Sequence, residues 1–200
     1  MAWLLAFVPV AALLTLTPGA ATAMVVRSAV RGGRRRALQT TIGNSIGVLT
    51  WACFAAVGIA AVVAASAEAF TAIKLVGAVV LLVLGVQSLR AKRAGEAIAA
   101  PAGGAPLRDG FVTSIANPKL AVFFAALFPQ FVPDGASVLG CALLMAALVV
   151  AFDLVWYSTL AYLVTRARRA FVEGPWLARA ERFTGAVLVG LGVRLALERR

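Results

Sequence analysis

The chain contains no histidine, only two cysteines and only 8 acidic residues among its 200. The absence of histidine excludes imidazole metal sites and histidine-based acid–base catalysis. Cys53 and Cys141 each stand alone inside an apolar stretch, which excludes a CxxC metal or redox motif and is typical of small buried residues. We therefore expect neither a metal site nor a cofactor.

Charged residues are also scarce. They make up 14% of the chain, against about 25% in an average soluble domain, and hydrophobic residues make up 62%. The mean hydropathy is +0.94, so the chain lacks the polar surface that would coat a globule in water. These figures predict a single integral membrane domain over residues 1–200, folded as an all-α, polytopic membrane helix bundle.

Uncharged or nearly uncharged stretches predict about six membrane-spanning helices, because about 20 residues of helix cross a hydrocarbon core of ~30 Å. Their residues do not alternate with period two, which favours helices over strands. The last stretch is short and contains Arg194, so whether it spans fully stays open. The predicted spans cover residues 1–26, 37–67, 70–89, 110–132, 136–165 and 183–197.

The arginines and lysines are gathered in alternate connections between these spans. By the positive-inside rule the basic loops are cytoplasmic, which places the N-terminus outside. The net charge of +11 is then explained by topology, and no nucleic-acid partner is expected. The three basic connections hold Arg27, Arg31, Arg34, Arg35 and Arg36; Arg90, Lys92, Arg93 and Arg108; and Arg166, Arg168, Arg169, Arg179 and Arg182.

Two halves of three spans each, about residues 1–95 and 105–200, would run in opposite directions and form a 3+3 inverted repeat. Each half has a proline inside its first helix, in Thr17-Pro18-Gly19 and in Asn117-Pro118-Lys119. Proline deletes one helical hydrogen bond, and broken backbone at membrane depth is tolerated only where it is buried in protein or lines a wet cavity. The pair of breaks predicts a central substrate pathway, with a simple kink as the alternative.

Two charged residues lie inside predicted spans, Lys119 in the fourth and Asp153 in the fifth. A charge at the bilayer centre costs at least ~2.5–3.5 kcal/mol, so both should face the bundle interior. Counted from the cytoplasmic ends, their depths are similar enough for them to pair. Two interpretations stay open: Asp153 carries a proton across the membrane while Lys119 competes for the carboxylate, or the two form a fixed buried ion pair.

Gly43 and Gly47 form a GxxxG pair in the second span. Small residues let two helix backbones approach closely, so packing is the expected role. Asn44 lies between them and is the exception, because an amide in lipid needs hydrogen-bond partners and could offer them to a ligand. We add Asn44 to the predicted substrate pathway.

Together these motifs resemble the LysE/RhtB family of amino-acid exporters over nearly the whole chain. The most specific element is Asn117-Pro118-Lys119 followed by Phe128-Pro129-Gln130-Phe131. The resemblance implies a bacterial inner-membrane secondary transporter, not an enzyme, that exports amino acids or their derivatives and is driven by the proton motive force. It adds Gln130 to the substrate pathway. The chain has Ala20 where family members often have proline, which puts the geometry of the first break in doubt.

The sequence leaves several alternatives open. The chain could export a metal ion or another small solute, form a passive channel, or be a membrane-embedded enzyme, although one secure mid-span carboxylate and no histidine make a poor catalytic site. The expected partners are an amino-acid-like small molecule, protons and membrane lipid. A homo-oligomer is left open.

Overall fold

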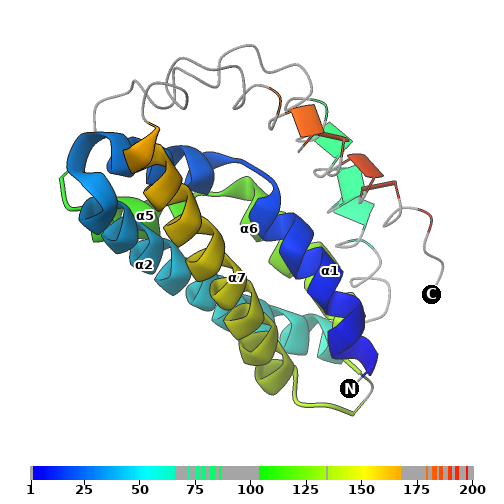
Figure 1. Ribbon diagram of the computed structural model, residues 1–200. Coiled ribbons are helices and arrows are strands. Elements are labelled where there is room, and N and C mark those ends of the chain that lie inside the picture. Colours follow the sequence, from blue (N-terminus) through cyan, green and yellow to red (C-terminus); the bar gives the residue numbers. More distant parts are fainter. Residues whose placement is uncertain are drawn as a thin grey trace.

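The computed structural model describes residues 2–65, 104–133 and 135–167, together with single helical positions between 72 and 86 and between 179 and 197. Every regular element within these residues is a helix (Figure 1). The all-α prediction is thus confirmed for this part of the chain. The predicted third and sixth spans, 70–89 and 183–197, lie mostly outside the described residues, so the number of spans and the 3+3 repeat stay predictions.

The first predicted span is a broken helix. Helix α1 covers Ala2–Leu16, and helix α2 begins at Ala20 and continues to Ala65. Between them, residues 17–19 leave the helical path around Pro18. The break that Thr17-Pro18-Gly19 predicted is therefore present.

Helix α2 is itself two helical halves joined at an elbow. Gly32 and Gly33 have non-helical backbone angles, and Gly33 has a φ of 67°, a conformation that residues with a side chain rarely adopt. Across the elbow, the hydroxyls of Ser28 and Thr40 are hydrogen-bonded at 2.8 Å. In one straight helix these residues would be separated by about 18 Å, so the chain folds back here and forms the predicted first and second spans.

The fourth predicted span changes helix type along its length. Helix α5 covers Pro106–Ile115, and α6 covers Pro118–Val122 after a break at Ala116 and Asn117. A π-helical turn, η1, follows at Phe123–Leu127, and a 3-10 turn, η2, at Phe128–Phe131. The second predicted break is therefore also present, immediately before Pro118.

Helix α7 covers Val138–Arg166 and begins with a side-chain cap, in which Ser137 Oγ accepts from the Gly140 amide at 3.2 Å. With 29 residues it is about 43 Å long at ~1.5 Å per residue, enough to cross a bilayer. By length and composition, Val138–Arg166 is long and apolar enough to span, and so is the stretch Ala20–Gly58, which includes the elbow at Gly32 and Gly33. Large apolar side chains on α7, such as Leu144 and Val155, are exposed, as expected of a surface that faces lipid.

Glycines bring α2 and α5 into close contact. A Cβ added at Gly47 would lie 2.4 Å from Ser114 Cβ, and one added at Gly110 would lie 2.0 Å from the Thr40 carbonyl oxygen. Only a residue without a side chain fits at such a crossing. The predicted packing role of the GxxxG pair is thus confirmed. Because Asn44 lies between the two glycines, the crossing also holds Asn44 close to α5.

The buried apolar side chains form two clusters. In the larger one, Phe7 of α1 packs on Phe123 and Phe131 of η1 and η2, with ring centroids 5.9 and 5.3 Å apart. The smaller cluster joins the first half of α2 to the later turns of α7, around Val25 and Leu160. Thr15 and Asp153 are buried but belong to neither cluster.

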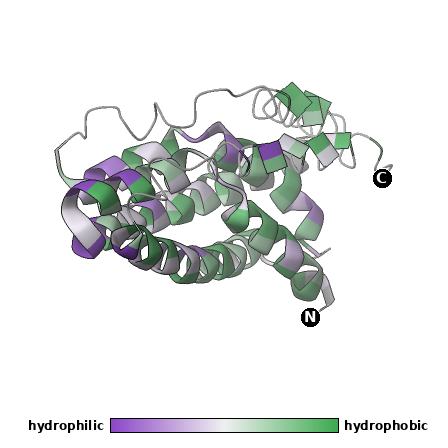
Figure 2. Cartoon of the chain, turned by 45° about the horizontal axis from the view of Figure 1, so that its top comes forward, coloured by the Kyte–Doolittle hydropathy of each residue, from purple (hydrophilic) through white to green (hydrophobic). Residues whose placement is uncertain are grey.

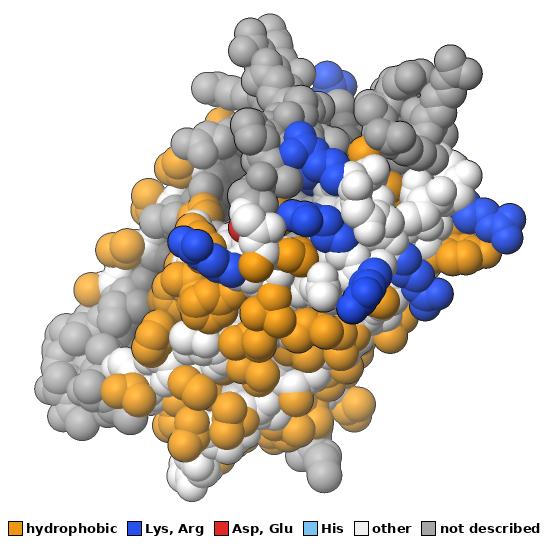
Figure 3. Space-filling view, turned by 90° about the vertical axis from the view of Figure 1, so that its left-hand side faces the viewer, with side chains coloured by type: hydrophobic (Ala, Val, Ile, Leu, Met, Phe, Trp, Pro, Cys, Tyr) orange, Lys and Arg blue, Asp and Glu red, His pale blue; other side chains and the backbone are white. Residues whose placement is uncertain are grey.

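Basic side chains gather at one end of the molecule, above an apolar surface (Figure 3). The same end is hydrophilic around the α2 elbow in Figure 2. Arg27, which the sequence placed in the first basic connection, instead lies inside the first half of α2 and is only 8% exposed. The exposed arginines around the elbow and the nearby helix ends are Arg31, Arg34, Arg35, Arg108 and Arg166.

Candidate functional site

The ammonium group of Lys119 binds the broken end of α1. Its Nζ donates to the carbonyl oxygens of Leu14 and Thr17, at 2.9 Å in each case. In an α-helix the Leu14 carbonyl would accept from the amide of residue 18, but Pro18 has no N–H. Lys119 thus supplies the donor that Pro18 lacks, and it joins the two proline breaks directly.

The second break positions this lysine. Asn117 caps α6, because its side-chain oxygen accepts from the Lys119 amide at 3.1 Å. Pro118 is accommodated in the first turn of α6, where a helix needs no amide donor. Lys119 therefore leaves the helix at its start and extends towards the first break. A Cβ built at Gly19 would lie 3.9 Å from Lys119 Nζ, so the ammonium fits closely beside the backbone there.

Asp153 is held by hydrogen bonds from two other elements. It lies in the middle of α7 and is 4% exposed. Thr15 of α1 donates to its Oδ1 at 2.7 Å, and the Asn44 amide of α2 donates to its Oδ2 at 2.9 Å. Hydrogen bonds to a carboxylate are about twice as strong as those between neutral groups, and these two link α1, α2 and α7 at one buried point.

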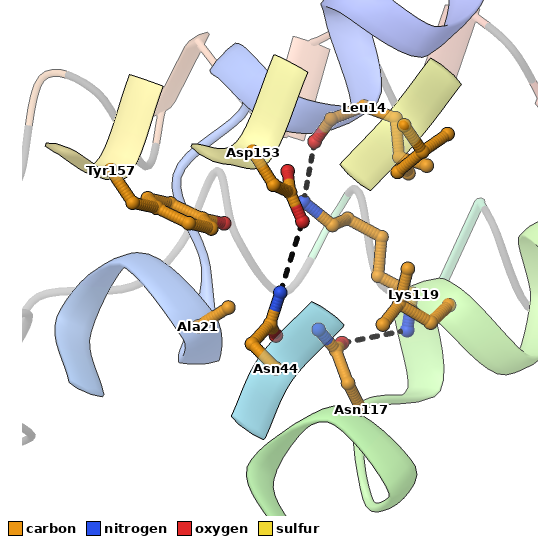
Figure 4. Close-up of a pocket in the computed structure, with 9 residues that line it drawn as sticks. Leu14, Ala21, Asn44, Asn117, Lys119, Asp153 and Tyr157 are labelled. Atoms are coloured by element: carbon orange, nitrogen blue, oxygen red, sulfur yellow. Dashed lines mark hydrogen bonds between the residues drawn. The ribbon is translucent and has the colours of Figure 1, made fainter. Parts of the chain in front are cut away.

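The groups around Lys119 and Asp153 line one pocket (Figure 4). It contains about 250 Å³ of space, including its opening. The positive charge of Lys119 and the negative charge of Asp153 attract each other across it, which offsets part of the cost of burying both. The lining residues are Leu14, Ala21, Asn44, Asn117, Lys119, Leu120, Val149, Asp153 and Tyr157.

The structure brings most of the predicted site residues together. Asn44, Asn117, Lys119 and Asp153 line the pocket, and the Thr17-Pro18-Gly19 break contacts it through Lys119. Lys119 and Asp153, which the sequence placed near each other in two neighbouring spans, line the same pocket and interact electrostatically. Gln130 is different: it lies in η2 and is not among the residues that line the pocket.

Two residues of the site, Thr15 and Tyr157, were not predicted from the sequence. Tyr157 is buried and lies four positions after Asp153, on the same face of α7. That spacing could have identified it. Thr15 had no comparable signal, because a threonine one turn before a helix break is equally consistent with a bond to its own backbone.

Two buried oxygen atoms beside the pocket lack a hydrogen-bond partner within the described ranges. They are the side-chain oxygen of Asn44, which lines the pocket, and the hydroxyl of Thr17. Buried polar atoms are nearly always paired, so acceptor capacity is left over at this site. Among the residues that the structure describes, no group of three His, Cys, Asp or Glu side chains could hold a metal ion.

Comparison with known proteins gives consistent relatives. The chain is 32% identical to an uncharacterized membrane protein of Vibrio cholerae, over 96% of this chain and 95% of that protein. It is 29% identical to the threonine efflux protein of Escherichia coli K12, over 92% of each chain. It is also 28% identical to the homoserine/homoserine lactone efflux protein of Salmonella typhimurium, over 98% of this chain and 97% of that protein. No solved structure gives a significant match.

The family comparison covers the whole pocket. The model of the LysE type translocators matches residues 12–199, a range that includes both proline breaks, Asn44, Lys119 and Asp153. The family suggested by the motifs is confirmed, and the apolar helices agree with the membrane-protein relatives. This chain is a bacterial membrane protein and belongs to the LysE type translocator family.

Proposed function

We propose that this protein exports amino acids or their derivatives across the bacterial inner membrane and that the pocket between Lys119 and Asp153 is its substrate site. The observation that carries the proposal is the contact between the two proline breaks: Lys119, after the second break, donates to the backbone carbonyls at the first break, and the buried Asp153 carboxylate lines the same pocket. The names of two relatives, threonine efflux protein and homoserine/homoserine lactone efflux protein, support the substrate class.

The pocket offers groups of both signs that an amino acid requires. Backbone carbonyls at the α1 break and the Asp153 carboxylate are acceptors for an ammonium group. The ammonium of Lys119 can pair with a carboxylate. Broken helices supply such groups at membrane depth without burying additional charges. A zwitterionic solute therefore fits the charges of this site better than a simple anion or cation does.

The conformation described here is closed around the site. Pockets that bind small molecules usually measure ~300–1,000 Å³, whereas the cavity volume here that a water molecule can enter is only about 10 Å³. Transport requires the helices to move apart on one side at a time. We expect the two proline breaks to act as hinges of a 3+3 inverted repeat, with one half rocking against the other.

Asp153 is the group proposed to couple export to protons. A proton that enters from outside would bind the carboxylate, neutralise it and remove its attraction for Lys119. Release of that proton to the cytoplasm would restore the charge. One proton would then move inward for each solute that moves outward, so the proton motive force would drive export.

Efflux from proteoliposomes with an imposed pH gradient tests this proposal. The wild-type protein should release preloaded threonine or homoserine faster when the gradient drives protons in the opposite direction. Asp153→Asn should lose that acceleration because its amide cannot carry a proton. Asp109→Asn removes a carboxylate at the start of α5, outside this pocket. This control variant should keep the acceleration by the pH gradient.

Two results would contradict the proposal. Release of the solute at equal rates with and without the gradient in the wild type would indicate a passive channel. Gradient-dependent export by Asp153→Asn at the wild-type rate, with normal expression, would exclude Asp153 as the proton carrier.

A further inference from the structure

The protein's own primary ammonium occupies the α1 break. Lys119 Nζ donates to the Leu14 and Thr17 carbonyls and faces the charge of Asp153. An ammonium has three N–H donors. Two backbone carbonyls accept from this ammonium, and the nearby carboxylate of Asp153 supplies the countercharge, so the surroundings suit a primary ammonium in polarity and in charge.

The site has more acceptor capacity than Lys119 uses. Asn44 is 2% exposed, its amide nitrogen is bound to Asp153, and its side-chain oxygen has no partner within the described ranges. Because that residue lines the same pocket, its oxygen is available to a second donor there. A ligand with N–H groups would complete the hydrogen bonding, whereas a ligand that offers only acceptors would not.

We infer that this is a primary-ammonium site, filled by Lys119 in the resting protein and taken over by the amino group of the solute during export. The inference rests on the proposed function and specifies it: the solute enters as a primary amine, and Lys119 is a tethered competitor that it displaces. The displaced lysine is then free to pair with the carboxylate of the same solute.

The exchange explains why a charged lysine would be kept at this depth. If Lys119 left an empty site, the carbonyls of Leu14 and Thr17 and the carboxylate of Asp153 would all lose a donor or a countercharge. Buried polar groups without partners are costly. Opening of the pocket without a solute is therefore disfavoured. Replacement of the Lys119 ammonium by that of the solute keeps the polar groups of the site hydrogen-bonded throughout.

Removal of the lysine should create a site for a free amine. In purified Lys119→Ala, methylammonium chloride should raise the unfolding temperature by roughly 3–5 °C at ten times its dissociation constant. Tetramethylammonium chloride at equal ionic strength should not, since it has no N–H. No such rise is expected in the wild type or in Lys119→Arg, because both keep a cation at position 119. Arg34→Ala should not show it either, because this variant removes an exposed cation at the elbow.

The amino acids themselves test the displacement. L-threonine methyl ester, which keeps the amino group but has no carboxylate for Lys119 to pair with, should stabilise Lys119→Ala more than the wild type, with an apparent affinity about tenfold higher, because no tethered competitor remains. L-threonine and L-homoserine should stabilise the wild type, in which the displaced lysine can pair with their carboxylate. N-acetyl-L-threonine, whose amino group is blocked, should give no rise. Adding Asp153→Asn to Lys119→Ala should abolish the response to methylammonium.

Loss of folding in Lys119→Ala would not leave the inference untested. Lys119→Met keeps most of the side-chain volume and should respond to methylammonium in the same way. If both variants fold only when methylammonium is present, the amine site is supported.

The inference fails if neither variant responds to methylammonium, or if the wild type and Arg34→Ala respond as strongly as the two Lys119 variants do. It also fails if methylammonium binds but exported amino acids do not. Gradient-driven export without any amine response would overturn the inference alone. An amine response without any export would overturn the proposed function alone.

Discussion

Gly43 of α2 lies against the backbone of Leu107 at the start of α5, so closely that a Cβ built on the glycine would be 1.9 Å from the Leu107 carbonyl oxygen. Gly43→Ala must therefore push the two helices apart. Overpacking of this kind costs about 1–3 kcal/mol, and the unfolding temperature should fall by roughly 2–4 °C per kcal/mol. Thermal unfolding of the purified variant measures the effect.

Gly58 provides the matched control. It lies on the same helix, and an added Cβ there meets nothing within 4 Å. Gly58→Ala should leave stability unchanged or raise it by up to about 1 kcal/mol, through the better helix propensity of alanine. Equal losses in the two variants would show that the α2–α5 crossing does not depend on the missing side chain.

Thr15→Val should weaken the support of Asp153. The substitution preserves the shape of the side chain but removes the hydroxyl that donates to Asp153 Oδ1 at 2.7 Å. A hydrogen bond to a charged group contributes about 1.5–3 kcal/mol, so the variant should unfold several degrees lower and export more slowly. Thermal unfolding and efflux assays measure the two effects.

Thr50→Val makes the same chemical change away from the pocket. Within the part of the chain that the structure describes, the Thr50 hydroxyl donates only to the Ile46 carbonyl of its own helix, so its loss should cost less than about 0.5 kcal/mol. If Thr15→Val matched this control in both assays, Asp153 would not depend on Thr15.

The sequence was informative wherever a single residue type dictates local geometry. Pro18 and Pro118 predicted the two breaks because proline cannot donate, and Gly43 and Gly47 predicted a close crossing because only glycine permits one. Both effects are local and need no knowledge of the partner. The long uncharged stretches likewise predicted helices in lipid, and the motifs predicted the family.

The exact partners in the pocket could not be predicted in the same way. The sequence predicted that Lys119 lies near Asp153, but the bonds of Lys119 to the Leu14 and Thr17 carbonyls depend on how two distant segments dock. Nothing in the local pattern distinguishes a lysine that neutralises a carboxylate from one that caps a broken helix. Gln130 shows the opposite case, since membership in a motif identified it while the fold places it outside the pocket lining.

The orientation in the membrane can be tested by cysteine labelling. After Cys53 and Cys141 are replaced by alanine, single cysteines are introduced at Arg34 on the elbow and at Ala136 before α7. If the basic end is cytoplasmic, a membrane-impermeant maleimide should label Ala136→Cys in intact spheroplasts and Arg34→Cys only in everted vesicles. The reverse pattern would place the basic end outside.

Pro18→Ala tests whether the open end of α1 is needed for transport. Alanine restores an amide that can donate to the Leu14 carbonyl and so competes with Lys119 for it. Removal of a proline from a helical path is worth about 3 kcal/mol, so the variant should be at least as stable as the wild type. Its export rate should nevertheless fall by roughly tenfold, because a continuous helix no longer offers an open Leu14 carbonyl to an ammonium group and cannot act as a hinge.

Pro9→Ala is the control for Pro18→Ala. Pro9 is an exposed residue within α1 and does not line the pocket. Its replacement makes the same chemical change and should leave efflux at the wild-type rate. A wild-type rate in Pro18→Ala, measured at equal expression, would mean that the first break is only a kink. Transport would then not depend on the bond between Lys119 and the Leu14 carbonyl, because the restored backbone amide would compete for that carbonyl and export would be unchanged.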